Sequence, residues 1–175
     1  FLGLLFLQTL PLSALAWSEG ITFSLPVITK HPENLHGLNF GVWYESENLI
    51  WRQFHLYFDV LGAHYWVPGP NIHASNINII AVSPIVRYLF KEHFGLTPYL
   101  ELSIGAAYLS NTRFANRNLG IHFSFQDRAG IGITLGSRQQ FSLGAHVVHY
   151  SNGSLSSHNS GITIPLMIDV SYKFA

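Results

Sequence analysis

Hydrophobic and polar residues alternate along most of the chain after residue 16, with the period of two that is typical of β-strands. The alternation predicts eight strands, which cover residues 20–29, 38–46, 50–61, 75–90, 97–110, 119–135, 138–151 and 161–174. In the last of them Ile162, Ile168 and Val170 alternate with Thr163 and Asp169. An unbroken strand would therefore place Thr163 and Asp169 together on the polar face.

Two all-β architectures produce such alternation, a soluble sandwich and a transmembrane barrel. The barrel is favoured because several segments have twelve or more residues, whereas strands of soluble proteins usually have about five or six. The minority face carries mainly Gly, Ser and Ala, as the packed lumen of a narrow barrel requires. A face exposed to water would instead be rich in Lys and Glu.

The connections between the predicted strands alternate in length, as in outer-membrane barrels, where short turns lie in the periplasm and long loops lie outside. The long ones are 30–37, 62–74, 111–118 and 152–160, and the short ones are 47–49, 91–96 and 136–137. The sheet has to close because lipid cannot satisfy free backbone groups. We therefore expect an all-β fold, an eight-stranded antiparallel up-and-down transmembrane β-barrel in the bacterial outer membrane.

Residues 1–16 precede the first strand and are rich in Leu. They end in Ala14-Leu15-Ala16, which predicts a signal peptide that is cleaved after Ala16. This stretch contains Gln8 and Pro11 and is shorter than the roughly 20 residues that a transmembrane helix needs. We expect residues 17–175 to form a single barrel domain.

Composition agrees with a protein that is solvated partly by lipid. Charged residues make up 10% of the chain, aromatic residues 14% and hydrophobic residues 48%. Nine Lys and Arg balance nine Asp and Glu, so no basic surface is available for a nucleic acid. The absence of Cys excludes disulfides, thiolate metal sites and a Cys nucleophile.

The interior of an eight-stranded barrel is just wide enough to be filled by side chains, so we expect no pore. Seven ionisable residues are predicted to face the lumen and to pair with one another: Asp59, Arg87, Glu101, Arg128, Asp169, His55 and His122. Asp127 falls on the apolar face of its strand, and we expect a bulge there that turns its carboxylate inward.

Candidate chemistry lies at the end of the seventh predicted strand, in His149 and Ser151. Residues two apart on a strand project from the same face, close enough for an imidazole–hydroxyl hydrogen bond. Both share the face of Phe141 and Leu143, which points to lipid, and they lie at the extracellular rim. We predict a serine carboxylic-ester hydrolase in which His149 takes the proton of the Ser151 hydroxyl, which then attacks an ester of a membrane lipid.

The oxyanion of such a reaction needs hydrogen-bond donors nearby. Asn152 and Gly153 follow the serine directly, and Asn159 and Gly161 lie in the same loop, so their amides and backbone N–H groups are candidates. The other histidines have no spacing that suggests a metal site, and we expect neither metal nor cofactor.

These residues resemble those of the outer-membrane lipid A 3-O-deacylase (PagL) family. The likeness covers roughly the C-terminal half, in constant order: Thr97–Glu101, Ile104-Gly105, Thr112-Arg113, Asn118–Gly120, Phe125–Arg128, Gly130–Gly132, His149–Gly153 and Asn159–Gly161. The resemblance implies hydrolysis of the ester at the 3-position of lipid A, which carries a hydroxyacyl chain. Ser151 would be the nucleophile and His149 the base, with lipid A or lipopolysaccharide as substrate, outer-membrane lipid as surroundings and no nucleic-acid partner.

The chain departs from the family at one position. In the family a Glu shortly after the serine orients the histidine, and the same spacing here gives Thr163. The Thr163 hydroxyl, the Asn159 amide or a backbone carbonyl are alternatives for this role. Loss of the orienting acid of a triad typically slows catalysis without abolishing it, so we expect an active enzyme that relies on His149 and Ser151. The alternative is a family member with little or no activity.

Other functions fit the same barrel. One is a non-catalytic structural or adhesion protein that uses its outer loops. Another is a different acyl hydrolase or an acyltransferase that acts on lipid A or phospholipid. The sequence also leaves open whether the chain forms a homodimer.

Overall fold

The computed structural model describes residues 17–46, 51–69, 74–136 and 138–174. They form ten strands and no helix. The strands are β1 (Trp17–Ile28), β2 (His36–Ser46), β3 (Phe54–Trp66), β4 (Asn76–Leu89), β5 (Leu96–Leu109), β6 (Arg113–Phe114), β7 (Arg117–Asn118), β8 (Phe123–Leu135), β9 (Phe141–Ser151) and β10 (Ile162–Lys173). The predicted signal peptide, residues 1–16, lies outside the described residues.

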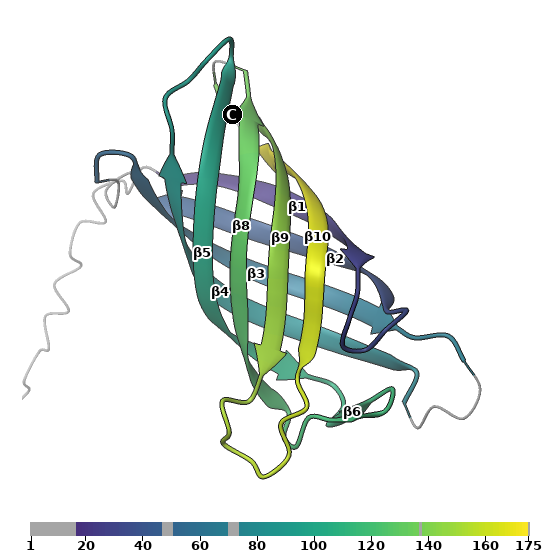
Figure 1. Cartoon of the computed structure of the whole chain (residues 1–175). Coiled ribbons are helices and arrows are strands. Elements are labelled where there is room, and N and C mark those ends of the chain that lie inside the picture. The colour runs from purple at the N-terminus through teal and green to yellow at the C-terminus, as the bar shows by residue number, and fades with distance from the viewer. Residues whose placement is uncertain (1–16, 47–50, 70–73, 137, 175) are drawn as a thin grey trace, which may run out of the picture.

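Eight of these strands close into one antiparallel barrel, in the order β1-β10-β9-β8-β5-β4-β3-β2 (Figure 1). Each strand pairs with its neighbour in the chain, and β1 pairs with β10 to complete the ring. The predicted all-β barrel is confirmed. Within the described part of the chain, no helix is long and apolar enough to cross a membrane.

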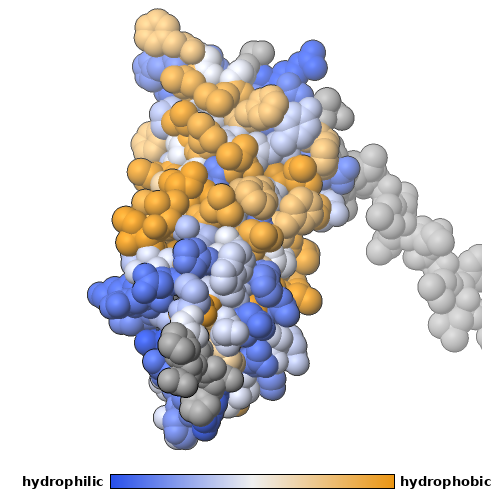
Figure 2. Space-filling model, turned by 90° about the vertical axis from the view of Figure 1, so that its right-hand side faces the viewer, coloured by the Kyte–Doolittle hydropathy of each residue, from blue (hydrophilic) through white to orange (hydrophobic). Residues whose placement is uncertain are grey.

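The two ends of the barrel differ. The connections 29–35, 110–122 and 152–161 lie at one end, which we call the loop end, and the shorter connection 90–95 lies at the other, the turn end (Figure 1). Figure 2 shows apolar side chains in a broad band on the outer surface and polar side chains gathered toward the loop end. This distribution is typical of a lipid-facing belt that adjoins water-exposed loops.

Some strand limits differ from the predicted ones. β3 starts four residues later than expected and continues to Trp66, through residues assigned to a loop, because Ala63 and Tyr65 still point into the barrel. The polar His64 on the outer face hides this alternation in the sequence. In the predicted loop 111–118, β6 and β7 form a short hairpin that lies over the loop end.

A β-bulge near Pro165 changes the faces of β10. The pairing of β10 with β9 is regular up to Ile164 and from Met167 onward, and it shifts between them. Since a one-residue shift exchanges the two faces of a strand, Ile162 and Ile164 are buried inside, whereas Ile168 and Val170 face outward. The predicted unbroken alternation is therefore wrong, and Thr163 faces outward while Asp169 faces the lumen.

The middle of the lumen is filled by an ionic network. Arg87 donates two hydrogen bonds to Glu101, which also lies 2.6 Å from His146 Nε2. His146 Nδ1 lies 2.5 Å from Asp169 Oδ1, and Arg128 donates to Asp59 at 3.0 Å. The cavity that remains here is about 30 Å³, enough for one or two water molecules.

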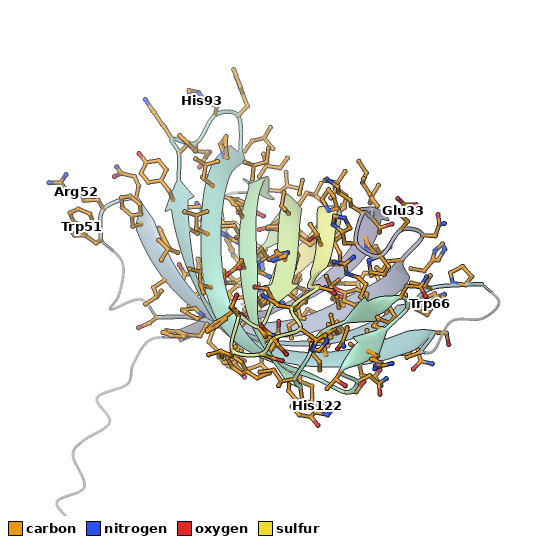
Figure 3. All side chains as sticks on the ribbon, turned by 60° about the horizontal axis from the view of Figure 1, so that its bottom comes forward. Glu33, Trp51, Arg52, Trp66, His93 and His122 are labelled. Carbon is orange, nitrogen blue, oxygen red and sulfur yellow. The ribbon has the colours of Figure 1, made fainter. Side chains whose placement is uncertain are left out.

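Two of the seven predicted lumen residues have other partners or places. His55 is paired, but with Glu45 at 2.5 Å, nearer the turn end. The prediction for His122 is wrong: it is exposed on the outside of the barrel and stacks on Tyr108 (Figure 3). It precedes β8 by one residue, so the alternation of that strand does not apply to it.

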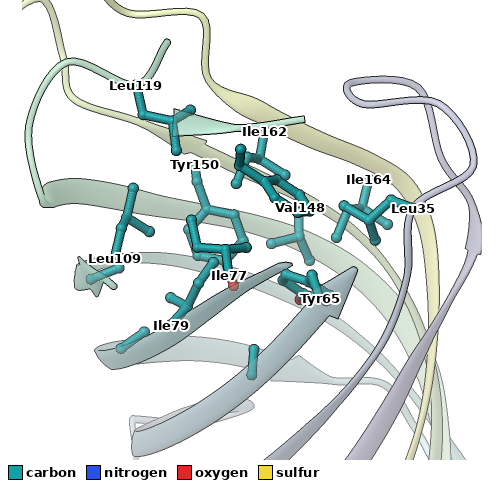
Figure 4. Close-up of a cluster of buried hydrophobic side chains, with 14 of the residues drawn as sticks. Leu35, Tyr65, Ile77, Ile79, Leu109, Leu119, Val148, Tyr150, Ile162 and Ile164 are labelled. Atoms are coloured by element: carbon teal, nitrogen blue, oxygen red, sulfur yellow. The ribbon is translucent and has the colours of Figure 1, made fainter. Parts of the chain in front are cut away.

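The loop end of the lumen is closed by an apolar cluster (Figure 4). Its members come from the strands, from the loops and from the hairpin, and they include Leu35, Tyr65, Ile77, Ile79, Leu109, Phe114, Leu119, Val148, Tyr150, Ile162 and Ile164. With the ionic network beneath it, this cluster fills the interior among the described residues. Any site that acts on a large molecule therefore has to lie on the outer face or in the loops.

Candidate active site

The two predicted catalytic residues lie where the sequence places them, on the outer face of β9 at the loop end. Ser151 is the last residue of the strand, and His149 is two residues before it. Both side chains are half-buried. Tyr150, which lies between them, and Val148, which precedes His149, are buried in the lumen. No hydrogen bond joins His149 to Ser151 among the described residues, and such contacts often tighten only when substrate is bound.

Three polar residues form a row across the outer face. In the pairing of the strands, His149 of β9 lies directly opposite Asp127 of β8 on one side and Thr163 of β10 on the other. The Thr163 hydroxyl lies 2.9 Å from His149 Nδ1. This contact leaves Nε2 as the ring nitrogen that is available to a second partner.

Asp127 does not turn inward. Its strand pairs with β5 and β9 in an unbroken register, so the expected bulge is absent and the half-buried carboxylate stays on the outer face. A carboxylate in hydrocarbon would be costly, but near the interface the cost of a charged residue falls to about 0–1 kcal/mol. The position of Asp127 at the rim therefore removes the need for a bulge.

The loop after Ser151 is held by its amides. The backbone N–H of Asn152 donates to Asn159 Oδ1 at 2.9 Å, and its side-chain amide donates to Leu119 O and His158 O. These bonds use the donors of Asn152. The N–H groups of Gly153 and Gly161 and the Nδ2 of Asn159 donate no hydrogen bond within the described residues.

Gly161 packs directly against the histidine. It has a φ of 61°, and a Cβ added to it would lie 3.1 Å from His149 Cε1 and 2.9 Å from Tyr150 O. Its carbonyl accepts a 2.5 Å hydrogen bond from Nε of Arg117 in β7, and the neighbouring Ser160 carbonyl accepts one from NH2 of the same side chain. Partial burial lowers the pKa of the Arg117 guanidinium from its ordinary value.

A shallow apolar groove runs from His149 along the outer face toward the turn end. It consists of three adjoining hollows of about 330, 520 and 530 Å³. The first is lined by Asp127 and His149, and the hollows are joined through small residues, Ala129 and Ala145. From His149 to Leu143 the groove is about 20 Å long, at roughly 3.4 Å per residue of strand.

This arrangement places a hydroxyl, an imidazole and an apolar groove on one lipid-facing surface. No group of three or more potential metal ligands occurs in the part of the chain that the structure describes. The alternation of the sequence is enough to single out His149 and Ser151 as candidates. It does not reveal Arg117, which lies 44 residues before Gly161 in the chain and meets it only through the packing of two loops.

Comparisons with known proteins agree with these observations. A family model described as Lipid A 3-O-deacylase (PagL) matches residues 33–173. The Lipid A deacylase PagL of Pseudomonas aeruginosa is 34% identical over 106 residues, which are 61% of this chain and 58% of that protein. The Lipid A deacylase PagL of Bordetella bronchiseptica is 30% identical over 114 residues, 65% of this chain and 60% of that protein. The chain thus spans about three fifths of these two relatives.

Two solved structures share the fold. The crystal structure of the outer membrane enzyme PagL superposes with a TM-score of 0.70 and 22% identity, over 87% of this chain and 98% of that one. That of Neisserial surface protein A gives a TM-score of 0.50 and 15% identity, over 90% and 96%. At these identities the two structures support the outer-membrane barrel fold.

Proposed function

The chain belongs to the lipid A 3-O-deacylase (PagL) family, and we propose from this premise that it removes an acyl chain from lipid A in the outer membrane. The ester cut is the one that links a hydroxyacyl chain to the 3-position, and the reaction uses Ser151 and His149. The single observation that carries the proposal is the pair itself: an imidazole and a hydroxyl side by side on the lipid-facing surface of a barrel whose lumen is filled.

Ser151 is the nucleophile and His149 the base. His149 Nε2 takes the hydroxyl proton while Ser151 Oγ attacks the ester carbonyl carbon, which gives a tetrahedral oxyanion. When this collapses, the bond to the sugar oxygen breaks and His149 returns the proton to that oxygen. Water then attacks the acyl-enzyme, again with His149 as base, and releases the fatty acid and free Ser151.

Thr163 takes the place of the orienting acid. Its oxygen accepts a hydrogen bond from Nδ1–H of His149, which holds the imidazole in the tautomer with a free Nε2. Unlike a carboxylate, the hydroxyl carries no charge to balance the imidazolium that forms during the reaction. We therefore expect a slower enzyme than one with an acid at this position.

The groove accounts for how the substrate reaches the site. Its polar end holds Asp127 and His149, and the outward-facing side chains toward the turn end are apolar, with Leu100, Ile131 and Leu143 beside the small Ala145. A lipid lying in the membrane can place its acyl chain there without leaving hydrocarbon. Its ester then lies at the height of Ser151, where the N–H of Gly153 and the Nδ2 of Asn159, which donate no hydrogen bond within the described residues, are candidates to stabilise the oxyanion.

Mass spectrometry of lipid A from cells with and without the protein tests the proposal. We expect the wild-type protein to remove the mass of one hydroxyacyl chain. The S151A and H149A variants should leave lipid A unchanged while they still form a folded barrel, which electrophoretic mobility before and after heating in detergent can check.

Other outcomes would support the rival functions. A gain of one acyl mass would indicate an acyltransferase, and release of fatty acid from phospholipid would indicate a different hydrolase. Lipid A that is the same with and without the wild-type protein would indicate a structural or adhesion protein. His149, Ser151 and Thr163 all come from one chain, so the proposed reaction needs no second copy, and the homodimer stays a prediction.

A further inference from the structure

Two loops at the loop end of the barrel are joined next to the proposed catalytic residues. Ser160 N donates to Asn118 O at 3.0 Å, and the Asn152 side chain donates to Leu119 O at 2.9 Å. Arg117 adds two hydrogen bonds, to the carbonyls of Ser160 and Gly161. The loop 110–122, which contains the hairpin, therefore supports the loop that follows Ser151 at Asn152 and at its end, Ser160 and Gly161.

Arg117 is the only side chain among the described residues that donates to the carbonyls of Ser160 and Gly161. It forms no ion pair there, so its two nitrogens are committed to neutral acceptors. A half-buried guanidinium that donates to two successive carbonyls fixes the orientation of the peptide plane between them. Few other side chains have the forked donors for such a contact.

The orientation of this peptide has a consequence for chemistry. In a trans peptide the C=O and the N–H point in opposite directions. Since the Ser160 carbonyl points to Arg117, the Gly161 N–H points away from it. Gly161 packs beside Ser151, Asn152 and Asn159, and its N–H has no acceptor among the described residues.

The same residue also limits the position of the base. The space where a Cβ of Gly161 would lie is 3.1 Å from Cε1 and 3.7 Å from Nε2 of His149. A movement of Gly161 by about 1 Å would therefore change both the donor and the packing of the imidazole edge. Misplacement of that size can cost about 100-fold in rate.

We propose that Arg117 is a positioning residue: through the Ser160 and Gly161 carbonyls it holds the Gly161 N–H as an oxyanion donor and keeps His149 in place. This inference rests on the proposed esterase function and deepens it. Arg117 acts from the hairpin and, among the described residues, forms no hydrogen bond with Ser151 or His149. Its removal should therefore affect turnover more than substrate binding.

The test compares R117M, R117K and R113Q in detergent with purified lipid A. Arg113 is a matched control because it lies on the same hairpin, is exposed and makes no side-chain hydrogen bond among the described residues. We expect R117M to lower kcat about 10- to 100-fold with KM changed less than about threefold. R117K, which can still donate to one carbonyl, should recover to within about fivefold of the wild type, and R113Q should equal it.

Two further measurements do not depend on lipid A turnover. A fluorophosphonate should label Ser151 of the wild type and of R113Q at equal rates, and that of R117M at least about tenfold more slowly. The NMR signal of the His149 Cε1–H group should shift in R117M and stay in place in R113Q. Heat-modified mobility on gels should show that every variant is folded.

Some results would overturn the inference. A wild-type kcat and labelling rate in R117M would mean that the contact is not used, and a raised KM with unchanged kcat would mean that Arg117 binds an anionic group of the substrate instead. A failure of the proposed function gives another result: the wild type itself would neither cleave lipid A nor be labelled at Ser151.

Discussion

The contact between Thr163 and His149 gives the most direct test of how the proposed site works with a hydroxyl, and not an acid, bound to the histidine. T163V keeps the shape of the side chain and removes the oxygen that lies 2.9 Å from His149 Nδ1. A hydrogen bond between neutral groups contributes about 0.5–1.5 kcal/mol, and one to a charged group about 1.5–3 kcal/mol. The imidazole becomes charged only as Ser151 attacks, so the contact is stronger in the transition state by about 1–1.5 kcal/mol.

This difference corresponds to a kcat about 5- to 13-fold lower for T163V, since about 1.4 kcal/mol is a factor of ten. Steady-state release of hydroxy fatty acid from lipid A in detergent measures it. T163S keeps the hydroxyl and should stay within about twofold of the wild type. T163E, which introduces the acid of the family at this position, should raise kcat by about tenfold because a charged acceptor roughly doubles the strength of the bond. If T163V turned over at the wild-type rate, Thr163 would not orient His149.

Three other changes test the surroundings of the site. G161A should lower kcat at least about tenfold and destabilise the barrel by about 1–2 kcal/mol in urea unfolding, because a Cβ there meets Tyr150 O at 2.9 Å and the φ of 61° disfavours it. A145F should block the groove, so release of a long acyl chain should slow while hydrolysis of a short soluble ester stays unchanged. F114A removes a fully buried ring from the apolar cluster and should cost about 3–5 kcal/mol of unfolding free energy, measured in the same urea titration.

The period-two pattern was sufficient for the barrel and for the outward face of β9 on which His149 and Ser151 lie, because a strand that separates lipid from a packed lumen has to alternate. It failed in β10, where the bulge near Pro165 exchanges the faces. The sequence does not reveal this bulge, because Ile164 is apolar and would fit either face of the strand. It was expected to face lipid, and it packs in the apolar cluster of the lumen instead. A lumen that is apolar at the loop end and ionic in the middle cannot be recognised from alternation alone.

For the candidate site too, the alternation indicated some residues and missed others. His149 and Ser151 were singled out as candidates because they are polar residues on a face that should be apolar. Thr163 was considered only for its spacing from Ser151, and the bulge that brings it onto the outer face was not predicted. Arg117 gave no local signal, since a lone arginine in a loop is usually solvated, and its role depends on a contact with Gly161 that only the packed loops create.

A site on the outer face follows from the way this barrel is stabilised. The lumen is closed by the apolar cluster at one end and by the Arg87–Glu101–His146 network below it, so no substrate-sized space remains inside the described barrel. Outward-facing residues contribute little to that interior, and a few of them near the rim can be polar at a small cost in stability, because water and headgroups are within reach. Catalysis on a lipid therefore requires no opening in the barrel. It requires that neighbouring strands place polar side chains in one row at the rim, and the bulge in β10 does this for Thr163 beside His149.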